Sequence, residues 1–302
     1  RYSTYCRNYE ENHLYKVVGG PNVDDYHWKE VMMRDIPNNR DGVSLHYYTV
    51  PNEWSDQGSA TVFDDADNYR TVRKAYFMDE LISKHSAIMD KYDPEKKVGL
   101  IVDEWGNWFN VEPGTNPGFL YQQNTMRDAV VAGIHMNIFN SHADRVRMAN
   151  IAQLVNVLQA LFLTEGAQMI LTPTYHVFDM YKVHHEARQL PVTVGTKNIS
   201  DDEGREFPVV SVSASVNADN VVHISIVNAG LKEDIELSCS LKTGRKLVKG
   251  KGNIITSENI HDHNSFGDPH KVVLYDFNDY TLKNNELTVN IPAGSVITLA
   301  LE

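Results

Sequence analysis

Hydrophobic residues recur every three or four positions along several stretches of the first 190 residues, and short apolar runs separate these stretches. The longer period predicts helices, and the short runs predict buried strands. The expected helices cover residues 2–14, 26–33, 67–92, 117–139 and 146–164, and the expected strands cover residues 15–21, 41–48 and 97–104. Strands that alternate with helices at this spacing predict βαβ units and a parallel sheet.

The pattern changes near residue 190. Beyond it β-branched residues alternate with polar ones, and the expected strands cover residues 209–216, 221–227, 234–241, 252–255, 272–275, 286–291 and 295–301. Strands of this length predict a β-sandwich, of the jelly-roll kind. A complete eight-stranded barrel takes roughly 250 residues, so three or four strands correspond to its second half. We therefore expect the C-terminal part of a (β/α)8 TIM barrel over residues 1–190 and a β-sandwich domain over residues 191–302.

Composition narrows the range of partners. The net charge of −12 argues against nucleic acid and against anionic membranes. No stretch approaches the length of a membrane span. The chain holds only two cysteines, far apart in sequence, so neither a disulfide framework nor a zinc site is expected. The low cysteine content slightly favours the cytoplasm over secretion, and the sequence leaves the location otherwise undetermined.

The strongest chemical signal is the apolar run that ends in Asp103 and Glu104, followed by Trp105 and Trp108. A buried strand that delivers a carboxylate to its C-terminal end, beside aromatic surface, is typical of sugar-cleaving enzymes. Acidic residues also follow strands merely because the chain is leaving the core, and the pattern alone does not decide between the two. Since neighbouring side chains of a strand point to opposite faces, we expect one acid in a site and the other on the far face.

Two further segments carry candidate residues. His46 and Tyr48 are two positions apart on an expected strand, so they share a face and can hydrogen-bond a carboxylate there, although a satisfied core network explains them equally well. Gln153 lies off the apolar stripe of an expected helix and can reach a sugar hydroxyl, although a solvent-facing glutamine is the more common case. His261, His263 and His270 match no metal-binding spacing, so we expect neither a metal nor a cofactor.

Together these segments resemble glycoside hydrolase family 51, the α-L-arabinofuranosidases. The resemblance covers essentially the whole chain and keeps its order. The matching segments are Gly20-Pro-Asn22, Ser44-Leu-His-Tyr-Tyr48, Asp103-Glu-Trp-Gly-Asn-Trp108, His142-Ala-Asp-Arg-Val146, Ala152-Gln-Leu-Val-Asn156, Leu171-Thr-Pro-Thr-Tyr175, Asn264-Ser-Phe266 and Ile291-Pro-Ala-Gly-Ser-Val296.

The resemblance implies a retaining glycosidase whose nucleophile is Glu104, and strand alternation then puts Asp103 on the opposite face of the strand. It places His46 and Tyr48 beside the nucleophile, with the tyrosine hydroxyl bonded to it. It makes Trp108 a wall of the sugar pocket and Gln153 a ligand of arabinose hydroxyls. The implied substrate is an arabinose-containing oligosaccharide or polysaccharide.

The sequence departs from the family in two respects: it contains no Gly-Asn-Glu, the motif that carries the acid/base glutamate, and it lacks the arginine and asparagines expected from the early strands. We therefore expect a C-terminal portion that is inactive alone, whose barrel is completed by an N-terminal half in another chain or in a removed segment. Self-association into a homo-oligomer is also expected from the resemblance. The alternatives are an endo-β-glucanase on the same scaffold and a non-catalytic carbohydrate-binding or assembly subunit.

Overall fold

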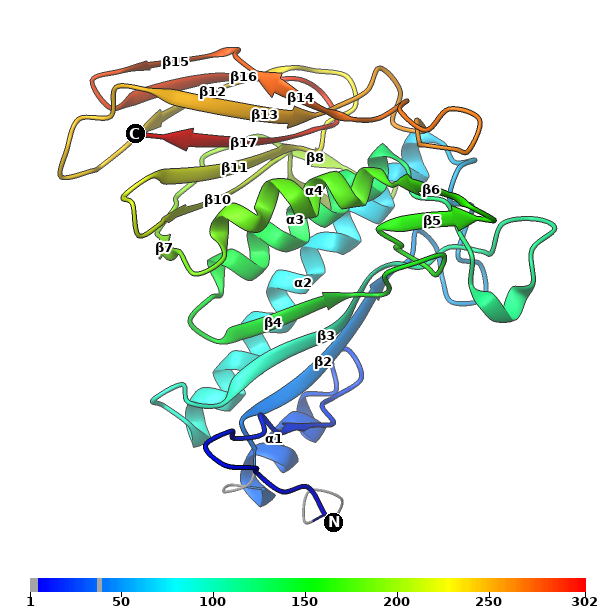
Figure 1. Ribbon diagram of the computed structural model, residues 1–302, viewed down its shortest axis with the longest axis vertical. Helices are drawn as coiled ribbons and strands as arrows, with labels where there is room; N and C mark the ends of the chain where they lie inside the picture. The colour runs from blue at the N-terminus through cyan, green and yellow to red at the C-terminus, as the bar shows by residue number, and fades with distance from the viewer. Residues whose placement is uncertain (1–4, 37–39) are drawn as a thin grey trace. The chain divides into compact units, whose positions relative to one another are not determined.

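The computed structural model describes residues 5–36 and 40–302, and these residues form two compact units (Figure 1). Unit 1 contains the described residues up to Tyr48 together with 77–105 and 142–151. Unit 2 contains residues 49–76, 106–141 and 152–302. No helix among the described residues is long and apolar enough to cross a membrane.

Unit 1 is organised around a four-stranded sheet with the order β1-β2-β3-β4. β1 pairs with β2 in parallel, and β3 pairs with β4 in parallel, as the strand–helix alternation predicts. Its elements are β1 (Val17–Val18), α1 (Tyr26–Asp35), β2 (Gly42–Thr49), β3 (Gly99–Asn107), β4 (Val146–Ile151) and the C-terminal half of α2 (Asp65–Tyr92).

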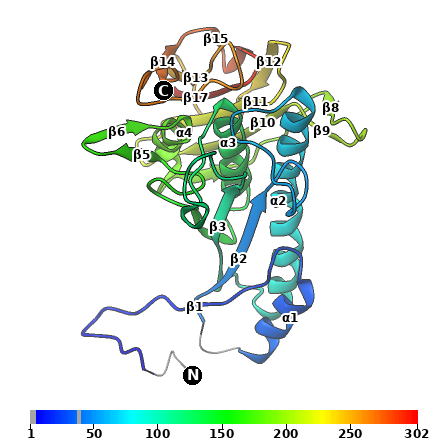
Figure 2. The ribbon, with the colours of Figure 1, turned by 90° about the vertical axis from the view of Figure 1, so that its right-hand side faces the viewer.

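Apolar side chains on β2 fix the helices of unit 1 to the sheet. Val43 and Leu45 are fully buried, and the Tyr47 ring meets the edge of Phe77 on α2 at a centroid distance of 5.6 Å. α1 starts where the Asp25 carboxylate accepts the N–H of Trp28, the usual N-cap bond. Figure 2 shows α1 and the C-terminal half of α2 on the same side of β2, which leaves the other face of this strand to polar residues.

Gly20 is required by a close approach to β2. A Cβ at this position would lie 1.5 Å from the carbonyl oxygen of Ser44, and the N–H of Gly20 donates to Ser44 Oγ at 2.7 Å. Only glycine allows the backbone to come this near. The contact lets the next residues continue along β2, so that Asn22 forms a parallel bridge with His46.

Unit 2 contains two sheets that share an apolar core. The six-stranded sheet has the order β14-β13-β17-β11-β10-β7, and the three-stranded sheet has the order β12-β16-β15. The hairpins β5-β6 and β8-β9 are separate. The strands are β5 (Phe162–Glu165), β6 (Gln168–Leu171), β7 (Arg188–Leu190), β8 (Asn198–Ser200), β9 (Glu206–Pro208), β10 (Val210–Val216), β11 (Val222–Asn228), β12 (Ile235–Ser240), β13 (Gly250–Ile255), β14 (Leu274–Phe277), β15 (Tyr280–Lys283), β16 (Glu286–Ile291) and β17 (Ser295–Leu301).

The six-stranded sheet is covered on both faces, so every residue of β11 is buried. One face carries Ile224 and Ile226 into the core shared with the three-stranded sheet. The other face packs on α3 (Met126–Ser141), next to α4 (Pro173–Tyr181), as Figure 1 shows. A Cβ on Gly133 of α3 would lie 2.8 Å from the Val227 side chain, so glycine sets the helix–sheet distance.

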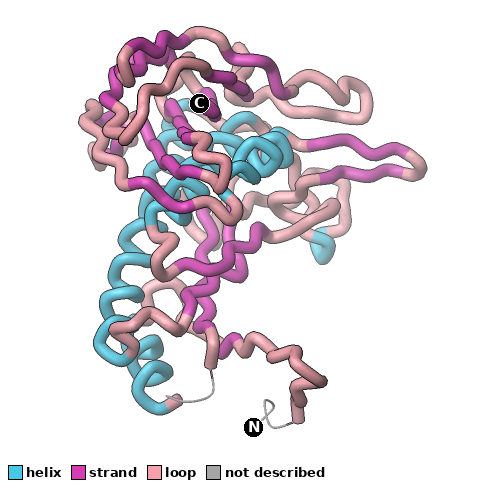
Figure 3. Tube along the Cα trace, turned by 60° about the vertical axis from the view of Figure 1, so that its left-hand side comes forward, coloured by secondary structure: helices cyan, strands magenta, loops and turns pink. Residues whose placement is uncertain are grey.

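The strands predicted beyond residue 190 are confirmed with small shifts at their ends. Two predicted helices, 2–14 and 146–164, are wrong, and the helix predicted for 117–139 is confirmed only from Met126 onward. The described part of 2–14 is not helical, and Figure 3 shows it as loop; residues 1–4 lie outside the described residues. In the predicted helix 117–139, residues 117–119 form a short 3₁₀ turn, and the α-helix, α3, begins only at Met126. The helix begins there because the Asp128 carboxylate accepts the N–H of Thr125, as in a capping box.

The largest correction concerns residues 146–164, where a strand, a loop and another strand replace the predicted helix. β4 and β5 occupy the two ends, and Asn156 and Leu158 between them have φ of 58° and 47°. Left-handed backbone cannot continue a helix. Ala152, Leu158 and Ala160 are buried as a loop, so the apolar spacing in this segment reflects a folded loop and not a helical stripe. Gln153 therefore lies on no helix.

Candidate active site

The C-terminal ends of β2 and β3 bring together the polar residues predicted from sequence. Tyr48 Oη donates a hydrogen bond to Glu104 Oε2 at 2.8 Å, although the two residues are 56 positions apart. His46, two residues before Tyr48, places Nδ1 at 3.7 Å from the same oxygen. The predicted grouping of His46 and Tyr48 at Glu104 matches this geometry.

Tyr48 acts as a hydrogen-bond donor to the carboxylate. Burial raises the pKa of its hydroxyl far above the ordinary value, and the neighbouring Glu104 raises this pKa further. The phenol therefore stays protonated at neutral pH, and its only role toward an ionised carboxylate is to donate. A donated hydrogen bond favours the charged form of a carboxylate, which is the form that a nucleophile requires.

Asp103 does not lie apart from this group, which corrects the prediction that it points to the opposite face. His46 Nε2 is 2.9 Å from Asp103 Oδ1, so the imidazole contacts both neighbouring acids through its two nitrogens. The reason is an irregularity in β3: Val102 pairs with Ala149 and Trp105 pairs with Ile151. Between these pairs, two residues of β3, Asp103 and Glu104, face one residue of β4, Asn150, so a bulge breaks strict alternation.

Glu104 is accessible as well as positioned. Its side chain is 47% exposed, and that of His46 is 43% exposed. Trp105, the next residue, is fully buried and anchors the strand end. The arrangement can supply an ionised, oriented carboxylate to a ligand on this face of the sheet, which is chemistry suited to attack on an electrophilic carbon.

Trp108 and Trp54 form an aromatic pair in unit 2. Their rings meet edge to face at a centroid distance of 5.5 Å, and the N–H of Trp108 donates to the carbonyl of Thr49 at 3.0 Å. Trp54 is 59% exposed. Sequence analysis missed Trp54, because it stands in a polar loop with no periodicity around it. The pair offers an exposed apolar surface of the kind that stacks on sugar rings.

Gln153 lies in the loop that follows β4, with its side chain exposed to solvent. Its N–H donates to the carbonyl of Val157 at 3.2 Å, and the peptide bond between Ala152 and Gln153 is cis. The position at the end of a strand fits a ligand-facing residue better than the predicted helix did. Its role in a pocket remains a prediction.

The histidine-rich segment that precedes β14 makes contacts with protein groups through its imidazole rings. The ring of His261 stacks on Phe63 at 4.1 Å and contacts the carbonyl oxygen of Phe63 through Nε2 at 2.7 Å. Among the described residues, no group of three or more His, Cys, Asp or Glu side chains is placed to hold a metal ion.

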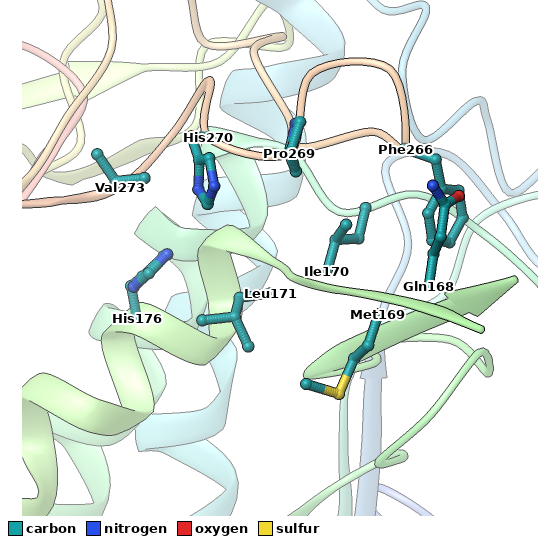
Figure 4. Close-up of a pocket in the computed structure, with 9 residues that line it drawn as sticks. All are labelled: Gln168, Met169, Ile170, Leu171, His176, Phe266, Pro269, His270 and Val273. Atoms are coloured by element: carbon teal, nitrogen blue, oxygen red, sulfur yellow. The ribbon is translucent and has the colours of Figure 1, made fainter.

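A separate cavity of about 320 Å³ lies in unit 2, as Figure 4 shows. His176 on α4 and His270 in the loop before β14 both turn toward it. The remaining lining is mostly apolar and includes Phe266 and Met169. Burial lowers the pKa of His176. None of the site residues predicted from sequence lines this cavity, whose volume is at the lower end of ligand pockets.

Comparison with known proteins identifies the family. Residues 103–295 match the family model described as the α-L-arabinofuranosidase C-terminal domain. A curated intracellular exo-α-L-arabinofuranosidase from Bacteroides ovatus is 45% identical over the whole chain. The chain belongs to the family of the α-L-arabinofuranosidase C-terminal domain. The match covers 59% of the length of the Bacteroides protein, so the chain spans about three fifths of this relative.

Solved family 51 structures have the same fold. The arabinofuranosidase from Xanthomonas axonopodis pv. citri superposes with a TM-score of 0.97 at 44% identity and covers 100% of this chain, which in turn covers 61% of that protein. A family 51 α-L-arabinofuranosidase from Bifidobacterium longum has a TM-score of 0.80 at 20% identity, covering 94% of this chain and 59% of its own. The second likeness concerns the fold alone.

Proposed function

We propose that this chain is the C-terminal portion of a retaining exo-α-L-arabinofuranosidase in which Glu104 is the nucleophile. The observation that carries the proposal is the bond from Tyr48 to Glu104 at 2.8 Å, with His46 beside the same oxygen. The name of the Bacteroides ovatus relative supports the substrate class over an endo-β-glucanase. The substrate is a terminal arabinofuranosyl residue of an oligosaccharide or polysaccharide.

In the proposed reaction Glu104 attacks the anomeric carbon and forms a glycosyl–enzyme bond while the glycosidic oxygen leaves. Water then cleaves this bond and returns the carboxylate. A retaining pair needs two carboxyl groups about 5–5.5 Å apart. Asp103 is paired with His46, so we assign it a supporting role and not that of the second catalytic carboxyl group. The acid/base that protonates the leaving oxygen is a glutamate outside this chain.

The proposal extends to the domain organisation, the sugar pocket, the oligomeric state and the cellular location. We place a half-barrel in residues 1–190 and a β-sandwich in residues 191–302, with the rest of the barrel supplied by an N-terminal half. Trp108 forms a wall of the sugar pocket and Gln153 contacts arabinose hydroxyls. The enzyme assembles as a homo-oligomer. Because the Bacteroides ovatus relative is named intracellular, a cytoplasmic location is favoured.

The test is Glu104→Gln in the complete enzyme that contains these residues, assayed on a nitrophenyl α-L-arabinofuranoside. Such a substrate carries a good leaving group, so its first step depends on the nucleophile more than on the acid/base. We expect kcat to fall by about a thousandfold or more, because covalent catalysis is lost. The matched control is Glu95→Gln, an exposed glutamate of unit 1 whose replacement leaves kcat unchanged.

Chemical rescue distinguishes a nucleophile from a structural residue. In Glu104→Ala, azide occupies the vacated space and attacks the anomeric carbon, so a glycosyl azide forms and nitrophenolate leaves. Turnover near the wild-type rate in Glu104→Gln would disprove the assignment. Sugar binding by the complete protein with no hydrolysis in the wild type would support the carbohydrate-binding subunit instead.

A further inference from the structure

A hollow of about 510 Å³ lies in unit 2, at one end of its two sheets. Its lining comes from the turns β11–β12 and β16–β17, from the segment after β13 and from the segment that leads into β14. Strand pairing brings these segments together. The end of β11 pairs with the start of β17 (Asn228 with Ser295), and the end of β13 pairs with the start of β14 (Ile255 with Leu274). The start of β12 likewise pairs with the end of β16.

Tyr275 on β14 supplies an aromatic ring to this hollow. It pairs with Ile254 of β13, which belongs to the apolar core between the two sheets. Directly paired residues lie on the same face of a sheet, so Tyr275 is on the core side. Phe277, two positions further along the same strand, is 5% exposed, whereas Tyr275 is 53% exposed. The tyrosine therefore lies where the core opens to solvent.

Two turns of the hollow are tied to each other by backbone contacts. The Asp234 carboxylate accepts the N–H of Ala293 at 3.0 Å, and the N–H of Gly294 donates to the carbonyl of Gly230 at 2.8 Å. Gly294 has a φ of 58°, a left-handed conformation that glycine adopts at little cost. These contacts hold the lining in place, so a ligand binds without first ordering the turns.

The segments next to β13 and β14 contribute polar side chains of both signs. The hydroxyl of Ser257 donates to the Asp262 carboxylate, and Lys271 Nζ lies 3.7 Å from the same carboxylate. The Thr256 hydroxyl and the exposed Glu258 carboxylate also line the hollow. Acceptors, donors and hydroxyl groups therefore stand beside one another. This mixture suits ligand hydroxyl groups, which both donate and accept hydrogen bonds, better than a ligand with a net charge.

We propose that this hollow is a second carbohydrate-binding site, which takes a stretch of a neutral polysaccharide chain and shares no residue with the proposed nucleophile site. A sugar ring has an apolar C–H face, which fits the exposed ring of Tyr275. It also has a rim of hydroxyl groups, which fits the side chains of Glu258, Thr256 and Lys271. The volume of about 510 Å³ is within the range of ligand pockets and exceeds the 320 Å³ of the cavity in Figure 4.

The experiment is native electrophoresis of the complete enzyme that contains these residues, through gels that hold a soluble polysaccharide. Linear arabinan, linear xylan and hydroxyethyl cellulose are the neutral probes, and polygalacturonate is the anionic probe. Because these long linear chains have few ends, slower migration reports binding to internal sugar units and not to a site for terminal residues. The dependence of mobility on polysaccharide concentration gives the Kd.

Two pairs of variants separate the groups that bind from their surroundings. Tyr275→Ala removes the aromatic ring, and Tyr275→Phe keeps it. Glu258→Ala removes a carboxylate of the hollow, and Glu236→Ala removes an exposed carboxylate of β12 outside it. Far-UV circular dichroism checks that each variant is folded.

We expect at least one neutral polysaccharide to slow the wild type. Tyr275→Ala should raise the Kd for that polysaccharide by about fivefold or more, the effect of losing one aromatic contact. Glu258→Ala should raise it by a smaller factor. Tyr275→Phe and Glu236→Ala should migrate as the wild type does.

The proposal is overturned if no neutral polysaccharide slows the wild type, or if only polygalacturonate does. Equal slowing of the wild type and a folded Tyr275→Ala variant would also overturn it. If Tyr275→Ala does not fold, Glu258→Ala decides, because migration equal to that of Glu236→Ala would refute the site. The gels measure binding alone, so a failure of Glu104→Gln to abolish hydrolysis would refute the proposed nucleophile without altering this result.

Discussion

Asp128 is a buried hydrogen-bond acceptor that holds the segment after β3 in place. Its Oδ1 accepts hydrogen bonds from Asn107 Nδ2 at 2.7 Å and Gln159 Nε2 at 2.8 Å. Its Oδ2 accepts from the N–H of Thr125 at 2.6 Å and from the Thr125 hydroxyl at 3.2 Å. All four residues are at most 1% exposed. The carboxylate therefore ties together the end of β3, the start of α3 and the loop before β5.

Asp128→Ala leaves at least three of these donors buried without an acceptor. Each such group costs about 1–3 kcal/mol. Removal of the carboxylate also abolishes the cost of burying its own charge, which offsets part of the loss. We expect the free energy of unfolding to fall by about 3–5 kcal/mol. Asp128→Asn keeps one acceptor oxygen for Asn107 and Gln159, so its loss should be smaller.

The measurement is urea unfolding followed by far-UV circular dichroism and tryptophan fluorescence. The matched control is Asp276→Ala at an exposed position of β14, which should change the free energy of unfolding by less than about 0.5 kcal/mol. A loss below about 1 kcal/mol in Asp128→Ala would refute the reasoning, because three orphaned donors cannot be so inexpensive. Equal losses in Asp128→Asn and Asp128→Ala would refute the part assigned to Oδ1.

Two further predictions concern unit 2. Gly133→Val should lower the free energy of unfolding by about 2–3 kcal/mol in urea titrations, because a Cβ alone at this position would lie 2.8 Å from the Val227 side chain. Gly133→Ala should lower it by less, and an equal loss in the two variants would contradict this explanation. Burial lowers the pKa of His184 to about 4, so the unfolded state binds more protons between that pH and about 6.5. The stability that neutral His184 contributes is therefore fully present above about pH 6.5 and is lost as the pH falls toward 4, by up to about 1.4 kcal/mol per pH unit. His184→Gln should flatten the pH dependence of the free energy of unfolding, measured by urea titrations at several pH values.

The sequence alone placed the candidate site residues on shared strand faces and strand ends, because period-two spacing and strand ends are local properties. His46 and Tyr48 share a face of β2 for this reason, and Tyr48 reaches Glu104 as the pattern predicted. The β-strands beyond residue 190 were predictable on the same ground. The family was also predictable, because its motifs are short contiguous segments.

Only the tertiary structure decided the features that depend on partners distant in sequence. The bulge of β3 is set by pairing with β4, and it brings Asp103 to His46 against the rule of alternation. The loop after β4 carries apolar residues at helical spacing, yet its burial under other segments selects left-handed backbone at Asn156. Burial of Lys29 likewise follows from the packing of α1 on β2. Local periodicity contains none of these contacts, because each becomes favourable only after distant parts of the chain have met.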